Sequence, residues 1–103
     1  MQQAGTQPDN VVGAVTGTDN VDSAERIAQL RLDINRLDQT IIDAVRERSQ
    51  VSQEIGRLRR STGGVKLVNT REVEIINRFR DELGEEGPVL ASLLLRMGRG
   101  KLG

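Results

Sequence analysis

The sequence lacks several residue types on which enzyme active sites commonly depend. Its 103 residues include no Cys, His, Tyr or Trp, and a single Phe. These absences exclude disulfides, thiolate and imidazole metal ligands, and imidazole or phenol groups as acid–base catalysts. Any chemistry must therefore come from Arg, Lys, carboxylates, hydroxyls, amides or the backbone.

Long hydrophobic runs are also missing. No apolar stretch approaches the roughly 18 residues of a membrane span, and no signal peptide is recognisable. A chain of 103 residues is also short enough to form one domain. We therefore expect a small, single-domain cytoplasmic protein.

The formal net charge of zero conceals two asymmetries. The 15 basic residues are 13 Arg and 2 Lys, whereas residues 1–24 contain three Asp and no basic residue. An excess of Arg favours bidentate recognition of carboxylate or phosphate, because Lys serves a solvated surface equally well. A GC-rich genome would produce the same bias.

A long amphipathic helix dominates the pattern. Its apolar positions are spaced by three and four residues, which is typical of one helical face. These positions, the apolar stripe, are Ile27, Leu30, Ile34, Leu37, Ile41, Val45, Val51, Ile55 and Leu58. The pattern predicts a helix over about 23–61, capped by Asp22 or Ser23 with Glu25 completing a capping box. Residues 1–21 have no such period and are predicted to be a disordered tail.

Two shorter helices follow within the predicted helical domain, 22–103. The first covers about 70–83 after a cap at Asn69 or Thr70, and the second covers about 88–98 with Pro88 in its first turn. The apolar faces are Val73, Ile76 and Phe79 on one helix, and Leu90, Leu93, Leu94 and Met97, expected to be buried, on the other. Gly98, Gly100 and Gly103 predict a mobile end. The sequence thus predicts an all-α fold with one long and two short helices.

The length of the first helix requires a partner. Thirty-seven helical residues extend about 55 Å, more than the remaining short helices can cover. A symmetric homodimer is the simplest partner, and a sustained coiled coil is the alternative. Arg48, which replaces a hydrophobic residue in the stripe, and Gly56 weigh against the coiled coil.

The arginines of this helix predict an anion site. Arg48 and Arg59 lie within roughly 20° of one face and about 16 Å apart. Arg31 lies about 25 Å from Arg48 and is turned by roughly 100°, so it cannot reach the same small ligand from the same helix. In an antiparallel dimer it could reach the partner's site. Spacing alone is equally compatible with an anion site and with surface arginines that only flank an apolar stripe.

Several motifs carry a resemblance that favours the anion site. They are Leu30-Arg31, Ile34-x-x-Leu37-Asp38, Arg46-x-Arg48, Ile55-Gly56-x-x-Arg59 and Arg71-Glu72. Together they resemble an all-α chorismate mutase, and residues 93–103 resemble the short intracellular delta subclass. The resemblance implies an intertwined homodimer that converts chorismate to prephenate for phenylalanine and tyrosine biosynthesis, without a metal or cofactor.

The resemblance also implies roles for single residues. Arg31 of the other subunit and Arg48 would hold the carboxylates of chorismate, and Arg59 would contact the ether oxygen. Glu72 would accept from the ring hydroxyl, and Arg71 would shape the pocket.

Three further site positions depart from the family pattern. Val68 stands where many members have an aspartate, and Leu95 where many have a serine. Arg99 stands where many have a glutamine near the ether oxygen. We include Arg99 among the catalytic positions, and Val68 and Leu95 among those that contact substrate.

The subclass also implies a partner. Its members are activated by 3-deoxy-D-arabino-heptulosonate 7-phosphate (DAHP) synthase, so we expect this partner to order residues 98–103 and the loop 63–68. An isochorismate pyruvate lyase of the same fold would use the same cations. Two further hypotheses are a structural helical adaptor and an Arg-rich dimer that binds nucleic acid. Zero net charge and a single aromatic residue disfavour nucleic-acid binding.

Overall fold

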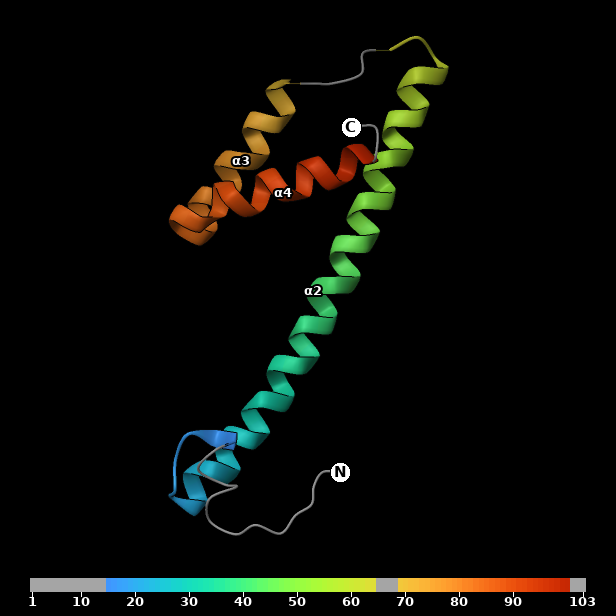
Figure 1. The fold of residues 1–103 in the computed structure, drawn as a ribbon. Helices are drawn as coiled ribbons and strands as arrows, with labels where there is room; N and C mark the ends of the chain where they lie inside the picture. The colour runs from blue at the N-terminus through green and yellow to red at the C-terminus, as the bar shows by residue number, and fades with distance from the viewer. Residues whose placement is uncertain (1–14, 65–68, 101–103) are drawn as a thin grey trace. The chain divides into compact units, whose positions relative to one another are not determined.

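The computed structural model describes residues 15–64 and 69–100, and its elements are all helical (Figure 1). The order is α2 (Val21–Ser61), α3 (Asn69–Leu83), the short 3-10 helix η1 (Gly84–Glu86) and α4 (Gly87–Arg99). Within the described ranges there is no strand, which confirms the predicted all-α class. Val68, the connector 65–68 and most of the predicted tail lie outside these ranges.

Helix α2 begins two residues before the predicted start and ends at the predicted residue. The Ser23 amide donates to Oδ1 of Asn20 at 2.8 Å, so Asn20 is the N-cap. The predicted cap at Asp22 or Ser23 is wrong, because both residues already lie inside the first helical turn. At the other end, the Gly64 amide donates to the Arg59 carbonyl at 2.6 Å and closes the helix.

The chain divides into two compact units, Met1–Ile41 and Ile42–Gly103, and α2 contributes to both. The first unit contains the first half of α2 and, among the described residues, the segment 15–20 that precedes it. Val15 and Thr16 are helical and the segment is hydrogen-bonded, which differs from the disordered tail expected there. The second unit contains the rest of α2 with α3, η1 and α4.

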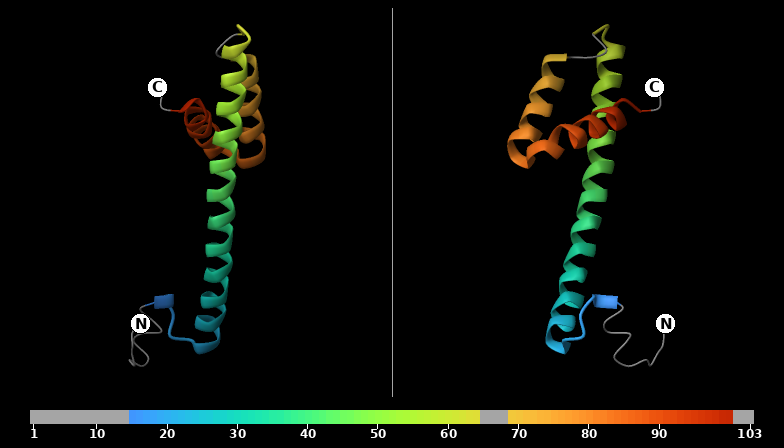
Figure 2. Two further views of the ribbon diagram at one scale, coloured as in Figure 1. Left: turned by 90° about the vertical axis from the view of Figure 1, so that its right-hand side faces the viewer. Right: turned by 60° about the vertical axis from the view of Figure 1, so that its left-hand side comes forward.

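In the second unit, α4 folds back from η1 and packs against α3 (Figures 1 and 2). Pro88 lies in the first turn of α4, as predicted. Gly98 does not end this helix, which continues to Arg99 and is followed by Gly100 as its C-cap. The mobile end was therefore predicted to start too early in the sequence, because Gly98 is buried inside the helix.

Few side chains are buried within the single chain. Among the described residues the buried hydrophobic ones are Ala24, Ala91 and Leu94. Most of the apolar stripe is exposed, with Ile34 at 54% and Ile41 at 59%. The expected burial of α4 is correct for Leu94 and wrong for the other three, Leu90, Leu93 and Met97, which are exposed. A single chain offers these side chains too little surface to cover them.

Candidate active site

An ion pair joins the two short helices of the second unit at predicted site residues. Nη2 of Arg99, in the last turn of α4, donates to both carboxylate oxygens of Glu72, at 2.9 and 2.8 Å. Glu72 lies in the first turn of α3 and its side chain is 22% exposed, against 46% for Arg99. The structure thus pairs Glu72, a predicted site carboxylate, with Arg99, the predicted site cation that departs from the family pattern.

The last turns of α4 are also held by side chains of α2. Nη1 of Arg48 donates to the Leu94 carbonyl at 3.4 Å, and Nε2 of Gln53 donates to the Met97 carbonyl at 3.3 Å. Carbonyl groups near a helix C-terminus carry partial negative charge, so a guanidinium and an amide are suitable partners. Arg48 is therefore attached to the same helix end that carries Arg99.

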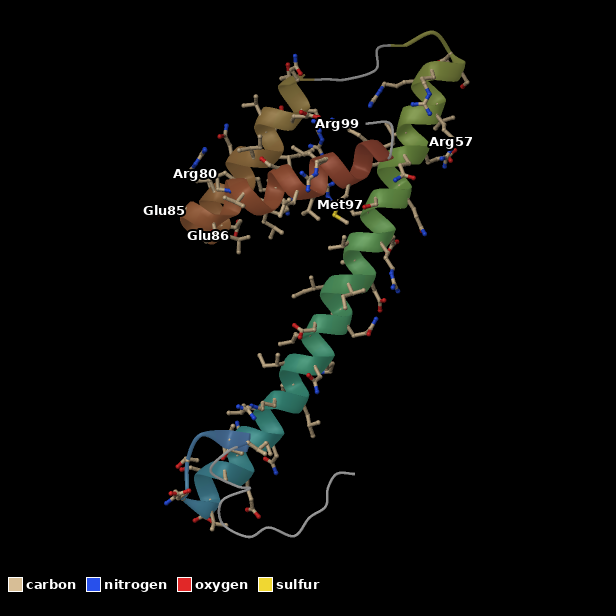
Figure 3. All side chains as sticks on the ribbon, in the orientation of Figure 1. Arg57, Arg80, Glu85, Glu86, Met97 and Arg99 are labelled. Atoms are coloured by element: carbon tan, nitrogen blue, oxygen red, sulfur yellow. The ribbon has the colours of Figure 1, made fainter. Side chains whose placement is uncertain are left out.

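Close packing of small residues lets α4 approach α2 at this point. A Cβ atom added to Gly98 would lie 2.5 Å from Oγ and 2.9 Å from Cβ of Ser52. A side chain at position 98 would push the two helices apart. Figure 3 shows Met97 and Arg99 leaving this part of α4 on different sides.

Arg59 lies in the last turn of α2, within the same unit. The residue is half-buried and its Nε atom is buried. Arg48 and Arg59 both belong to α2, so the helical geometry places them about 16 Å apart along its axis. A partly buried guanidinium is less screened by water, so it interacts more strongly with an anionic group.

The remaining predicted site residues have different surroundings. Arg71 pairs with Glu74 of its own helix at 3.7 Å, with both side chains largely exposed, so it is not joined to the Glu72–Arg99 pair. Leu95 is half-buried on α4, and Val68 lies outside the described residues. Arg31 belongs to the first unit, where its Nη1 donates to the Val15 carbonyl.

Taken together, the second unit presents cations from two helices and a carboxylate from a third. Arg48 and Arg59 come from α2, Arg99 from α4 and Glu72 from α3. This composition suits an anionic ligand that also offers a hydrogen-bond donor. Among the described residues no acidic cluster could hold a metal ion, and no helix is long and apolar enough to cross a membrane.

Ser52 and Gln53 support this arrangement although the sequence analysis did not select them. Both are polar residues at the edge of the apolar stripe, and their role depends on contacts 44 or more residues away. A faint signal existed in the small residues Ser52 and Gly98, since small side chains allow helices to approach closely.

Comparison with known proteins gives a consistent result. The family model described as chorismate mutase type II matches residues 30–98. The intracellular chorismate mutase of Mycolicibacterium smegmatis is 48% identical over 85 residues, covering 82% of this chain and 82% of that protein. The intracellular chorismate mutase of Mycobacterium tuberculosis H37Rv is 49% identical over 77 residues, covering 75% of this chain and 72% of that one.

A solved structure agrees with the sequence relatives. It is the non-covalent complex of DAHP synthase and chorismate mutase from Corynebacterium glutamicum with a bound transition state analog. The match has a TM-score of 0.74 at 61% identity, and covers 82% of this chain and all of the other. The family match extends over well more than half of the sequence and includes the motifs from Leu30-Arg31 to Arg71-Glu72, so this chain belongs to the chorismate mutase type II family.

Proposed function

We propose that the protein catalyses the rearrangement of chorismate to prephenate, the reaction that supplies phenylalanine and tyrosine biosynthesis. The observation that carries the proposal is the family match over residues 30–98, which includes Arg31, Arg48, Arg59 and Glu72. It ends one residue before Arg99, so the Glu72–Arg99 pair links a residue within the family match to one just outside it.

The chemistry suits a chain without His or Cys. The rearrangement is unimolecular: the ether C–O bond breaks as a new C–C bond forms, and no proton is transferred and no covalent enzyme intermediate is made. The substrate is a dianion that must adopt a compact conformer before reacting. Guanidinium groups that bind its two carboxylates supply that orientation. We assign this task to Arg48 and to Arg31 of the other subunit.

Rate enhancement then depends on charge at the ether oxygen. Negative charge accumulates there as the C–O bond breaks, so a fixed cation beside it binds the transition state more strongly than the ground state. We assign this role to Arg59, whose Nε is buried.

Glu72 is the acceptor for the ring hydroxyl in this proposal. Its carboxylate already binds Arg99 through both oxygens, and each oxygen has a second lone pair for a further donor. Arg99 would offset the negative charge of Glu72 in a pocket that must admit a dianion. Arg71, Leu95 and Val68 remain proposed contributors to the pocket wall.

The exposed stripe supports a homodimer as the active form. Leu30, Leu37 and Val51 are 41%, 44% and 53% exposed in the single chain, and the stripe continues along α2. Burying a side chain of this kind contributes about 1.5–3 kcal/mol, so a partner copy would stabilise the fold substantially. In the dimer, Arg31 of one subunit also reaches the site of the other subunit. On its own helix it lies too far from Arg48 to bind the same ligand.

DAHP synthase is the proposed regulatory partner. The related Corynebacterium glutamicum chorismate mutase is found in a complex with that enzyme, and the two curated relatives above carry the name intracellular. We therefore place this protein in the cytoplasm with DAHP synthase and expect the complex to raise its turnover. Equal turnover with and without the synthase of the same organism would remove this part of the proposal.

A spectrophotometric assay of chorismate disappearance tests the main proposal. We expect the full chain to consume chorismate and to form prephenate, identified by chromatography of the products. Isochorismate supplied to the same preparation provides the matched comparison. Release of pyruvate from isochorismate without consumption of chorismate would identify a lyase instead and refute the mutase assignment.

A further inference from the structure

A hydrogen bond joins the segment of residues 15–20 to a proposed substrate-binding arginine. Nη1 of Arg31 donates to the backbone carbonyl of Val15, across 16 positions of the sequence. Figures 1 and 2 place residues 15–20 beside the first turns of α2. These residues precede the region matched by the family model, which begins at residue 30.

Local hydrogen bonds hold the segment in this folded-back course. Oγ1 of Thr16 donates to the Thr18 carbonyl at 3.2 Å, and the Asn20 amide donates to Oγ1 of Thr18 at 3.2 Å. The N-cap bond from the Ser23 amide to Asn20 then attaches this turn to α2. Ala24, in the first turns of α2, is only 7% exposed, unlike the stripe that follows it. The Val15 carbonyl therefore adjoins a hydrogen-bonded turn that is continuous with the start of α2.

The contact uses one side of the Arg31 guanidinium. A guanidinium has five N–H donors in a plane, and a bond at Nη1 restrains the orientation of that plane. The edge formed by Nε and Nη2 is one of the pairs that can bind a carboxylate through two parallel hydrogen bonds. A restrained side chain loses less conformational entropy when the carboxylate binds.

We propose that the turn of residues 15–20 is a positioning element, which orients Arg31 through the Val15 carbonyl for binding a substrate carboxylate. The role of Arg31 rests on the proposed function, whereas its restraint by the turn does not. The turn acts through Arg31 and does not touch the substrate. The turn should therefore lower the KM for chorismate and leave kcat nearly unchanged. The reason is that the substrate carboxylate is bound similarly in the ground state and the transition state.

Gly17 offers a selective way to release the turn. Its φ of +84° lies in the left-handed region, and a Cβ at this position would have nothing within 4 Å. Gly17→Pro imposes φ near −65° and disfavours the helical conformation of the preceding Thr16, so the turn cannot form. Gly17→Asn is the matched control, because Asn tolerates a positive φ and there is space for its side chain.

The first measurement is the side-chain Nε–Hε order parameter of Arg31, recorded by NMR in the full chain without chorismate. We expect a restrained Arg31 in the unmodified protein and in Gly17→Asn, and a mobile one in Gly17→Pro. Equal mobility in all three proteins would overturn the positioning role. This result does not depend on whether the protein converts chorismate.

The second measurement is a kinetic comparison in two backgrounds. Gly17→Pro should raise KM for chorismate about three- to tenfold with kcat within about twofold, and Gly17→Asn should match the parent chain. In an Arg31→Lys background, Gly17→Pro should have no further effect, because the ammonium lacks the guanidinium edge that the turn orients.

Other kinetic outcomes decide against the proposal. An equal rise of KM in both backgrounds would show that the turn acts on the whole structure instead of on Arg31. A lower KM in Gly17→Pro would mean that the Val15 carbonyl competes with the substrate. Absence of mutase activity in the unmodified chain would refute the proposed function, and the NMR measurement would still decide whether the turn restrains Arg31.

Discussion

The two units of this chain use the same long helix in different ways. In Met1–Ile41, α2 presents a stripe of exposed hydrophobic residues, and its one buried hydrophobic residue among those described is Ala24. In Ile42–Gly103, α2 supplies Arg48, Ser52 and Gln53 as contacts for the end of α4. Both units thus expose apolar side chains, and the second also contains contacts between its own helices.

The two halves of α2 therefore differ in the side chains that they contribute to the proposed site. An exposed apolar stripe is unfavourable in water, and it continues from the first half of α2 into the second, so we expect a partner copy to cover it along the helix. The second half carries Arg48 and Arg59 in the unit that also contains Glu72 and Arg99, so most of the proposed chemistry belongs to one chain. Arg31 is the exception, because it lies in the unit that we expect to assemble with the partner.

The largest expected effect comes from removing the proposed electrostatic catalyst in the second unit. Arg59→Ala should lower kcat about 100- to 1,000-fold, on the scale of a lost preorganised donor. Arg57→Ala is the control. Arg57 is 57% exposed, pairs with Glu54 at 2.6 Å, and lies on the side of α2 away from α4 (Figure 3). Steady-state assays should find the control within about twofold of the parent; near-full turnover of Arg59→Ala would refute the mechanism.

A charged residue in the apolar stripe of the first unit should weaken the expected homodimer. Leu37→Glu should weaken the dimer by about 2–3 kcal/mol, because a carboxylate would be buried without a partner. Leu32→Glu is the control, since Leu32 is 67% exposed and lies about 140° around the helix from Leu37. Analytical ultracentrifugation measures both. A stable dimer of Leu37→Glu, or equal dissociation of the two variants, would count against the stripe as the interface.

Within the second unit, a methyl group at Gly98 tests the contact between α2 and α4. Gly98→Ala should destabilise the fold by about 1–3 kcal/mol and lower turnover, because its Cβ would overlap Ser52. Ser52→Gly in the same chain removes the overlapping atoms and should restore part of the loss. Urea unfolding of both single variants and the double variant gives the coupling between the two sites. Strictly additive effects would show that the overlap is not the cause.

The smallest expected effect concerns the Glu72–Arg99 pair. Arg99→Gln should lower the free energy of unfolding by about 0.2–1 kcal/mol, because Arg99 is 46% exposed and the ion pair is partly screened by water. Catalytic activity should decrease but persist, since Gln can still donate to Glu72 and to an ether oxygen. Arg96→Gln on the same helix controls for loss of charge. Complete inactivation by Arg99→Gln alone would assign Arg99 a larger role than this pair supports.

The sequence predicted the helices well because their signals are local. The three- and four-residue spacing of apolar side chains identified α2, the residues Thr62-Gly63-Gly64 marked its end, and Pro88 identified the first turn of α4. The cap at Asn20 was missed because Asp22 and Ser23 are equally good capping residues by type. Only the backbone course shows which of these side chains precedes the first turn.

The residues of the proposed site come from sequence motifs, whereas their contacts come from the structure. Arg48, Arg59 and Glu72 were recognised from motifs, and Arg99 was recognised as a departure from the family pattern. The carboxylate that binds Arg99 lies 27 positions away, and this pairing has no spacing rule from which to predict it. Arg71 was expected in the pocket, yet its ion-pair partner is Glu74, one helical turn away.

By itself the sequence determined an all-α chain with arginines on one long helix and an apolar stripe too long for its short helices to cover. Those features follow from residue type and helical period, which act over a few residues. Only the tertiary structure decided that Gly98 packs on Ser52, that Glu72 pairs with Arg99 and that Arg31 donates to the Val15 carbonyl. Each of these contacts joins residues that are distant in sequence, and the folded backbone alone determines which of them meet.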